Sequence, residues 1–254
     1  MAEPALETRS LTVRFGGHVA VDAVSCRFRA GELTAIVGPN GAGKTTYFNA
    51  ISGRVHATQG QILLDGQDIT RLPMAARTRR GLGRAFQLTS LFPGLSVFEN
   101  VRLAVQARQR KGARLFALAD ADHAMADAAR AVLDQVQLRH LSGRLAGELS
   151  HGDQRKLEVG LLIALEPRVF LFDEPTAGMS ADAAPAILRL IEDIRRDATR
   201  CVLLVEHRMG VVRRLADRII VLHNGALAAD GTPAEVMAAD VVRDAYLGRS
   251  LADA

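Results

Sequence analysis

The residues with the clearest chemistry form a glycine-rich run that ends in a lysine and a threonine, Gly-Pro-Asn-Gly-Ala-Gly-Lys-Thr at positions 38–45. This run fits the pattern G-x-x-x-x-G-K-[ST], in which glycines let backbone N–H groups curl around a phosphate. An apolar strand over 33–37 should precede it, and a helix over 46–52 should follow. A helix N-terminus carries about half a positive charge, which favours anions. We therefore expect nucleotide phosphates to be bound by Gly38, Asn40, Gly41, Gly43, Lys44, Thr45 and Thr46.

Two residues at the end of this run have different expected roles. Lys44 is one of only three lysines among 32 basic residues, and it would reach the β- and γ-phosphates as a compact point charge. Thr45 would offer its hydroxyl to Mg²⁺. A glycine-rich turn before a helix, without any ligand, is the alternative interpretation. The strand and the helix on either side favour the phosphate site.

Two adjacent carboxylates, Asp173 and Glu174, follow a second apolar run over 169–172. Because α/β sheets bind ligands at the carboxyl ends of their strands, both would lie at the edge where the phosphate loop begins. Asp173 is the candidate for holding Mg²⁺ through water, and Glu174 is the candidate general base that polarises the attacking water. Taken alone, the pair would be ordinary surface carboxylates, so the interpretation depends on the phosphate loop.

Composition and charge limit the classes of protein and partner. No stretch reaches the roughly 18 uninterrupted apolar residues of a membrane span, the N-terminus lacks a secretory signal, and the two cysteines are typical of a reducing compartment, so we expect a cytoplasmic protein. The net charge is +4, but residues 71–114 hold ten basic residues and one acidic residue. This +9 segment is compatible with nucleic acid, an anionic membrane surface, an acidic partner or merely a solvated face.

The hydrophobic pattern predicts one α/β domain with an insertion. Short apolar runs alternate with helical stretches, and a small antiparallel sheet is expected early in the chain. The period changes to that of helices between about 91 and 152, so we expect a core and β subdomain over about 1–90 and 153–254, with a helical subdomain between them. The expected strands are 11–15, 21–28, 33–37, 61–64, 169–172, 201–205 and 218–222, with a hairpin at Asn224-Gly225, and the expected helices are 97–108, 121–138, 155–165, 182–196 and 209–215.

Residues 149–154, Leu-Ser-His-Gly-Asp-Gln, carry the first resemblance to a known family. Ser150 and Asp153 fit an S-x-x-D capping box before a helix, which is a sufficient structural explanation. The segment also resembles the L-S-G-G-Q signature motif of ATP-binding-cassette (ABC) ATPases, with departures at His151 and Asp153. The resemblance implies a P-loop NTPase (RecA-like) core with an antiparallel β subdomain and an inserted helical subdomain. It also implies that Ser150 and Gly152 meet the γ-phosphate of ATP.

Other positions match this family in its order along the chain. Phe15 resembles the aromatic residue that stacks on adenine, although an edge-strand core residue is the alternative. Gln87 resembles the glutamine that contacts Mg²⁺ and the attacking water, and His207 resembles the histidine that contacts the γ-phosphate. Ser180 stands where an aspartate is usual, which leaves the communication across the dimer open.

The sequences of three segments, 149–158, 174–179 and 245–248, are similar to those of LivG-type ATPases of branched-chain amino-acid importers and their urea and amide relatives. This likeness implies two membrane permease subunits, a second ATPase in a homodimer or heterodimer, and an extracytoplasmic solute-binding protein. The chain would then lie on the inner face of the membrane through the permease. The rivals are an ABC ATPase that acts on nucleic acid, a cassette for lipid or lipopolysaccharide export, and a binding module without catalysis.

Overall fold

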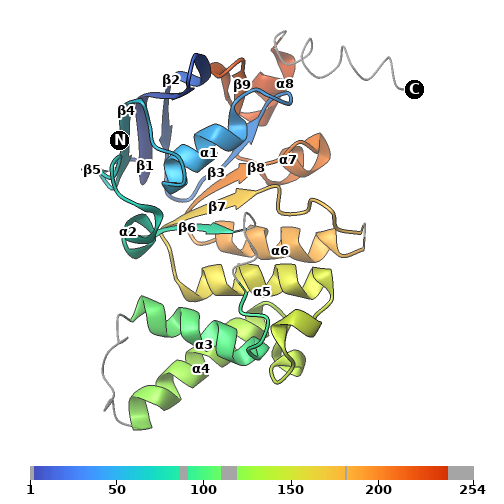
Figure 1. The fold of residues 1–254 in the computed structure, drawn as a ribbon. Coiled ribbons are helices and arrows are strands. Elements are labelled where there is room, and N and C mark those ends of the chain that lie inside the picture. The colour runs from blue at the N-terminus through green and yellow to red at the C-terminus, as the bar shows by residue number, and fades with distance from the viewer. Residues whose placement is uncertain (1–2, 86–90, 110–118, 181, 240–254) are drawn as a thin grey trace. The chain divides into compact units, whose positions relative to one another are not determined.

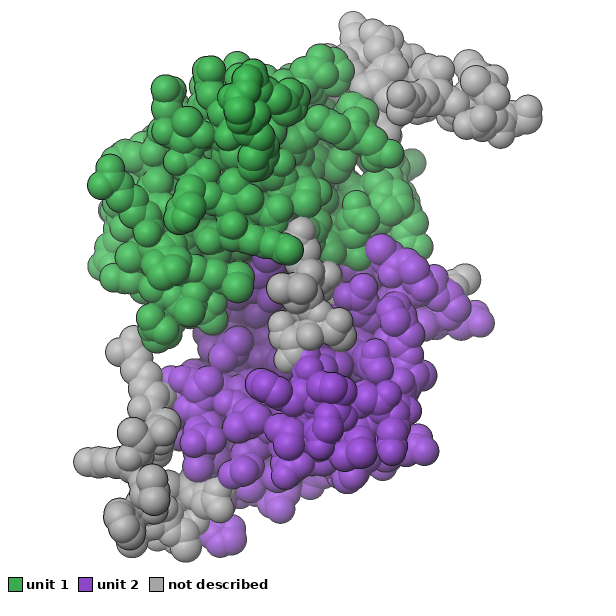
Figure 2. Space-filling view, in the orientation of Figure 1, with its two compact units in different colours: residues 1–82, 168–174, 194–254 green, residues 83–167, 175–193 purple. Residues whose placement is uncertain are grey.

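The computed structural model describes residues 3–85, 91–109, 119–180 and 182–239, with only the backbone at 119–122. The chain divides into two compact units, which Figure 2 colours separately. Unit 1 holds residues 1–82, 168–174 and 194–254, and unit 2 holds 83–167 and 175–193. The helical insertion expected over about 91–152 falls within unit 2. Within the described part of the chain, none of the helices combines the length and the hydropathy that a membrane crossing requires.

An antiparallel sheet forms the first part of unit 1, as predicted. Its order is β2-β1-β4-β5, from β1 (Leu6–Phe15), β2 (His18–Phe28), β4 (Gln59–Leu64) and β5 (Gln67–Asp68). β1 begins five residues earlier than expected. The register of β1 shifts between Thr8 and Leu11, around Ser10, whose φ is 44°. This bulge breaks the alternation of apolar residues by which a strand is recognised, and Gly60 makes room for it, since a Cβ there would lie 2.3 Å from the Ser10 carbonyl oxygen.

A six-stranded, mainly parallel sheet follows in the order β10-β9-β3-β8-β7-β6 (Figure 1). β3 and β8 are buried along their whole length, as expected for central strands covered on both faces. The carboxyl ends of β3, β7 and β8 therefore meet at one edge. The strands are β3 (Leu33–Val37), β6 (Leu82–Ala85), β7 (Val169–Asp173), β8 (Cys201–Val205), β9 (Arg218–His223) and β10 (Ala226–Gly231), with the predicted Asn224-Gly225 hairpin between the last two.

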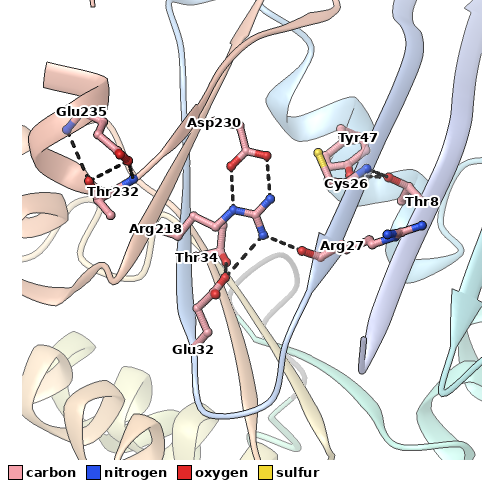
Figure 3. Close-up of polar contacts among 10 residues, drawn as sticks. All are labelled: Thr8, Cys26, Arg27, Glu32, Thr34, Tyr47, Arg218, Asp230, Thr232 and Glu235. Carbon is pink, nitrogen blue, oxygen red and sulfur yellow. Dashed lines mark hydrogen bonds and ion pairs between the residues drawn. The ribbon is translucent and has the colours of Figure 1, made fainter. Parts of the chain in front are cut away.

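Helix α1 (Lys44–Ser52) lies between the two sheets of unit 1 (Figure 1). Tyr47, Phe48 and Ile51 are fully buried in a cluster with residues of β1, β7 and β8. The Tyr47 hydroxyl is hydrogen-bonded to the Thr8 hydroxyl at 2.8 Å, so the buried phenol is satisfied (Figure 3). The opposite face of the six-stranded sheet, called the central sheet below, is covered by α7 (Met209–Leu215) and α8 (Pro233–Ala238).

An arginine at the start of β9 joins the sheets of unit 1. The guanidinium of Arg218 donates two hydrogen bonds of 2.6 Å to Asp230 of β10 and one to the Arg27 carbonyl at the end of β2, and it lies 3.4 Å from Glu32 (Figure 3). The bonds to Asp230 hold the pKa of Arg218 above its ordinary range. Because one end of this network lies on β2 and the other on β9 and β10, it fixes the antiparallel sheet against the central one.

A second arginine is buried where the sequence suggests an exposed basic patch. Arg77, in the unpredicted helix α2 (Met74–Arg79), is only 1% exposed. Its guanidinium donates to four backbone carbonyls, including those of Ala50 at 2.7 Å and Ile51 at 2.6 Å in the last turn of α1. Burial lowers the pKa of Arg77 to about 10. Arg77 is thus a C-terminal cap of α1, and it does not belong to the surface charge.

Helices form most of unit 2. Helices α3 and α5 pack on each other and on α4, whose buried face contains Ala129 and Leu133, and Val136 directly after α4 is also buried. α4 ends three residues before the predicted Leu138 because Gln137 has a φ of 59° and the Leu138 N–H turns back to the Leu133 carbonyl at 2.8 Å. The helices are α3 (Val97–Arg108), α4 (Ala119–Gln135), α5 (His151–Ala164) and α6 (Ala184–Arg195), the last of which ends in unit 1.

Candidate functional site

The phosphate loop lies between β3 and α1, as predicted, and its glycines are required by the close approach of other backbone. A Cβ at Gly38 would lie 2.2 Å from the Leu222 carbonyl oxygen, and one at Gly43 would lie 2.3 Å from the Ala20 carbonyl oxygen. Gly43 has a φ of 93° and is the N-cap of α1, without a side-chain hydrogen bond to the cap. The first N–H groups of the helix are therefore available to an anion.

Lys44 is held against its own loop. Its Nζ donates to the Gly38 carbonyl at 2.7 Å and to the Pro39 carbonyl at 2.9 Å, and the residue is 8% exposed. Burial lowers the pKa of Lys44, and the charges of Glu174 and Asp173 oppose that effect. The structure therefore brings the predicted lysine and both predicted carboxylates into one electrostatic neighbourhood. Because both carboxylates favour the charged ammonium, they help Lys44 to keep the positive charge that attracts an anionic ligand.

Both carboxylates lie at the carboxyl end of β7. Asp173 is the last residue of the strand and is partly buried. Glu174 has a φ of 46°, a left-handed conformation that is uncommon in a residue with a side chain, and its N–H donates to the Val205 carbonyl at 2.9 Å. The side chain of Glu174 is 43% exposed. The backbone is thus fixed by β8 while the carboxylate remains accessible to water and ligand.

His207 follows β8 at the same edge. Its Nδ1 lies 3.9 Å from Glu174 Oε1, and its side chain is 57% exposed. This contact is an ion pair only when the imidazole is protonated, and at this distance it leaves both groups free to turn toward a ligand. The structure therefore places the predicted histidine beside the predicted base.

Phe15 lies at the tip of the β1–β2 hairpin, opposite His18, and is 52% exposed. This exposure argues against the alternative of a core residue. The hairpin reaches the phosphate loop close to this tip, since the Ala20 carbonyl lies against Gly43. Val19 and Val21 are the next residues that could pack against an adenine ring if Phe15 does not. Val21 is fully buried, whereas Val19 is partly accessible.

Thr45 is exposed and Thr46 is partly buried in the first turn of α1, so the Thr45 hydroxyl is accessible beside Lys44. Gln87 lies outside the described residues. Ser150 and Gly152 belong to unit 2. No cluster of three or more His, Cys, Asp or Glu side chains suited to a metal is found in the described ranges. The oxygen donors on unit 1 that fit Mg²⁺ are the hydroxyl of Thr45 and the carboxylate of Asp173.

In unit 2, Ser150 is the N-cap of α5, which begins at His151, four residues earlier than predicted. The Ser150 hydroxyl accepts the Asp153 N–H at 3.2 Å and donates to the Asp153 carboxylate at 2.8 Å, so Ser150 caps the helix with its side chain, which is one half of the expected capping box. Burial favours the neutral acid at Asp153, but hydrogen bonds from Lys156 and Ser150 outweigh it and lower its pKa. The start of α5 borders a surface hollow lined by His151, Gly152, Arg155, Ala177, Gly178, Met179, Ser180 and Ala183.

Glu206 is a further carboxylate at this edge that no sequence motif includes. It is 1% exposed and lies between Val205, whose carbonyl holds Glu174, and His207. An acidic residue directly after an apolar strand was the available signal, and it is the same signal that led to Asp173 and Glu174.

These features define a nucleotide-binding cassette, with a glycine-rich phosphate loop, an acidic strand end and a histidine around one sheet edge. Comparison with known proteins agrees, since the family described as ABC transporter matches residues 21–177. The chain belongs to the ABC transporter family, and it is an ATPase. The predicted fold class and the predicted resemblance are both confirmed.

Several relatives match nearly the whole chain. The high-affinity branched-chain amino acid transport ATP-binding protein BraF of Pseudomonas aeruginosa is 36% identical over 98% of this chain and 100% of its own. LivG of Escherichia coli, of the same description, is 35% identical with the same coverage. The lipopolysaccharide export system ATP-binding protein LptB of Escherichia coli is 33% identical over 96% of this chain and 97% of its own. A solved ATP-binding cassette of an ABC transporter in its ADP conformation is similar with a TM-score of 0.82, at 27% identity over 98% of this chain and 100% of that one.

Proposed function

We propose that this chain is the ATP-binding and hydrolysing subunit of an importer for branched-chain or related amino acids, urea or amides. The observation that carries the proposal is the convergence of Lys44, Asp173, Glu174 and His207 at one sheet edge of a chain that matches BraF and LivG over nearly its full length. The convergence supports hydrolysis, and the full-length likeness supports import.

The phosphate loop would bind the β- and γ-phosphates of ATP through its N–H groups and Lys44. Thr45, Asp173 and Gln87 would hold Mg²⁺, and hydroxyl, carboxylate and amide oxygens are ligands that this ion accepts. When bound, Mg²⁺ would neutralise charge that develops on the phosphates. Phe15, exposed at the hairpin tip, would stack on adenine.

Glu174 would accept a proton from the water that attacks the γ-phosphorus, while the bond to the β-phosphate oxygen breaks and inorganic phosphate leaves. Its fixed backbone and accessible carboxylate suit a group that must meet a water molecule from one direction. His207 would contact a γ-phosphate oxygen. Its separation of 3.9 Å from Glu174 allows both side chains to reach the same small group.

Ser150 and Gly152 would complete the site from a second ATPase subunit, either a copy of this chain or a different cassette. The start of α5 offers N–H groups beside a surface hollow, and a helix N-terminus of this kind can contact a phosphate. The phosphate would be brought to it by the nucleotide bound on the other subunit. ATP would then close the dimer, and hydrolysis would reopen it. An attached permease would change its accessible side with each cycle.

Permease subunits would dock on unit 2. Phe92 and Leu145 are 56% and 42% exposed, and they lie on two segments joined by a bridge between Ser96 and Leu145. The basic residues of the +9 segment contribute less than their number suggests, because Arg108 is ion-paired with Glu166 in unit 2 and Arg77 is buried in unit 1. We propose that the apolar pair anchors the permease and that exposed arginines add salt-dependent attraction.

This docking surface is tested by the variant Phe92→Asp, which should reduce co-purification with the permease while ATP binding is unchanged. Replacing Arg108 and Arg110 by glutamate is the simplest test of charge, but its result would be harder to interpret. A carboxylate at position 108 would face Glu166, and Arg110 lies outside the described residues. Arg144→Gln is the better partner variant, because Arg144 is exposed beside Leu145, and it should weaken docking more at low salt than at high salt. Unchanged docking by both variants would contradict the proposed surface.

The second candidate function is lipopolysaccharide export, because LptB matches the chain nearly as well as BraF does. Action on nucleic acid is disfavoured by the burial of Arg77 and the pairing of Arg108.

We propose that the protein lies at the inner face of the membrane through its permease, with a solute-binding protein on the other side. Reconstitution with candidate permease subunits tests the proposal. ATP-driven uptake of labelled leucine, isoleucine or valine supports import, and stimulation of the ATPase by lipopolysaccharide instead would favour export.

A further inference from the structure

The residue before the proposed γ-phosphate histidine is a buried carboxylate at the centre of the site edge. β8 lies between β3 and β7, and its last residue, Val205, is in register with Ile36 and Asp173. Glu206 therefore leaves the sheet at the level of the phosphate loop and of Glu174. Val205 belongs to the core cluster that contains α1, so the alternation of side chains directs Glu206 to the opposite face, where α7 begins.

The carboxylate of Glu206 holds the chain just beyond His207. Its Oε1 accepts the backbone N–H of Arg208 at 3.2 Å and the Arg208 Nε at 3.3 Å. The Oε2 atom is buried and makes no hydrogen bond among the described residues. An enclosed carboxylate is costly unless it is paired, so these contacts with Arg208 constrain both groups. Because His207 lies between the two ends of this tether, the tether fixes the backbone from which the imidazole projects.

We propose that Glu206 is a positioning residue for ATP hydrolysis, which acts by holding the 206–208 turn so that His207 stays beside Glu174. The inference rests on the proposed function in one respect, the participation of His207 in turnover. It assigns to Glu206 no contact with nucleotide. The imidazole is 57% exposed, with little packing of its own to orient it, so its orientation depends on the backbone that carries it.

The test is a double-mutant cycle with kcat and KM measured for ATP. Glu206→Ala should lower kcat about tenfold and change KM for ATP less than about twofold, because the phosphate loop is untouched. Glu206→Gln should retain most of the activity, since its amide oxygen accepts the same backbone N–H. In a His207→Ala background, Glu206→Ala should cause no further loss of kcat. A merely structural residue would instead lower activity by the same factor in both backgrounds.

A matched control is Glu7→Ala, which removes another buried carboxylate, bonded to Arg9 and Arg27 on the antiparallel sheet. It should lower the melting temperature and leave kcat unchanged. If Glu206→Ala does not fold, Glu206→Leu replaces it, because leucine fills a similar buried volume and cannot accept the Arg208 N–H. If Glu206→Ala lowers kcat by a further tenfold in the His207→Ala background, the inferred role of Glu206 is overturned, while the proposed role of His207 is unaffected. Normal turnover by His207→Ala would overturn the role of His207, and the inference with it.

Discussion

The two motif regions of the molecule are built differently. In unit 1 the phosphate loop is enclosed by backbone from β2 and β9, and Lys44 is 8% exposed with two carbonyl partners. In unit 2 the start of α5 is exposed, and Ser150 is bonded only within its own first turn among the described contacts. The first region is preorganised around a ligand, whereas the second is a capped helix beside an open hollow.

The two regions therefore differ in what each can bind alone. The loop in unit 1 has the donors, the charge and the burial to bind nucleotide phosphates by itself. The start of α5 has N–H groups and a hydroxyl but nothing that encloses a ligand, so it needs an incoming surface to complete a site. The contrast supports a composite site in which one subunit supplies the loop and another supplies the signature helix. Variants in each region can test this.

The largest expected effect is that of Glu174→Gln on turnover. The amide keeps the shape of the side chain but cannot accept the proton of water, so kcat should fall by about 10² to 10⁴, or about 2.7 to 5.4 kcal/mol in the barrier. ATP should bind at least as well, because a negative charge near the γ-phosphate is lost. If the chain can pair with itself, an ATP-dependent dimer should accumulate on size exclusion. Lys44→Ala is the matched control, and it should lose both binding and dimer.

A Glu174→Gln protein that hydrolyses ATP normally would remove Glu174 from the mechanism. One that stays monomeric with ATP, but dimerises when a second ATPase is added, would show that the composite site is heteromeric. The comparison between the regions would then hold across two different chains.

The next effect is on stability and concerns the far end of α1. Arg77→Met leaves four backbone carbonyls without their donor, including those of Ala50 and Ile51. The free energy of unfolding should fall by about 3 to 5 kcal/mol, measured by denaturant titration. Arg79→Met, on the exposed side of the same helix, is the control and should change it by less than about 0.5 kcal/mol. Equal stabilities of the two variants would show that Arg77 is not the cap of α1.

Where the sequence was informative, local pattern and tertiary structure agreed. The strands 33–37 and 201–205 and the helices 97–108 and 209–215 were predicted to the residue, since they are continuous apolar runs or periodic stretches with clear ends. The ends of α4 and β1 were missed because a glutamine at 137 and a serine at 10 adopt left-handed conformations that usually indicate glycine. Composition does not reveal such positions.

The meeting of the phosphate loop, the two carboxylates after β7 and His207 after β8 follows from topology, because each of these motifs comes at the carboxyl end of a strand in one parallel sheet. Partnerships of charged residues were not predictable. Arg77 and Arg108 both count toward the basic segment, yet one is buried and the other is paired with Glu166. Glu206 has the same sequence environment as Asp173 but is 1% exposed. Charge counts carry no information on burial, which depends on contacts distant in sequence.

A smaller effect is expected at the hairpin tip of unit 1. Phe15→Ala should weaken ATP binding by about 1 to 3 kcal/mol, the scale of one base–aromatic stack, and leave the fold intact because the ring is 52% exposed. Nucleotide titration of both proteins measures this. Phe92→Ala removes a similarly exposed ring from unit 2 and should leave affinity unchanged. If Phe15→Ala binds ATP as tightly as the parent, Val19 is the next residue to test against the base.

The smallest effect decides the comparison between the two regions. Ser150→Ala removes the hydroxyl that accepts the Asp153 N–H, and the lost cap should cost about 1 kcal/mol of stability. Ser150→Asp supplies a new cap acceptor, so thermal unfolding should return close to that of the parent. It also adds a negative charge where a γ-phosphate from the second subunit would arrive, so ATP-dependent dimerisation and turnover should stay low. If Ser150→Asp restores stability and turnover together, Ser150 is only a helix cap, and the start of α5 does not complete a composite site.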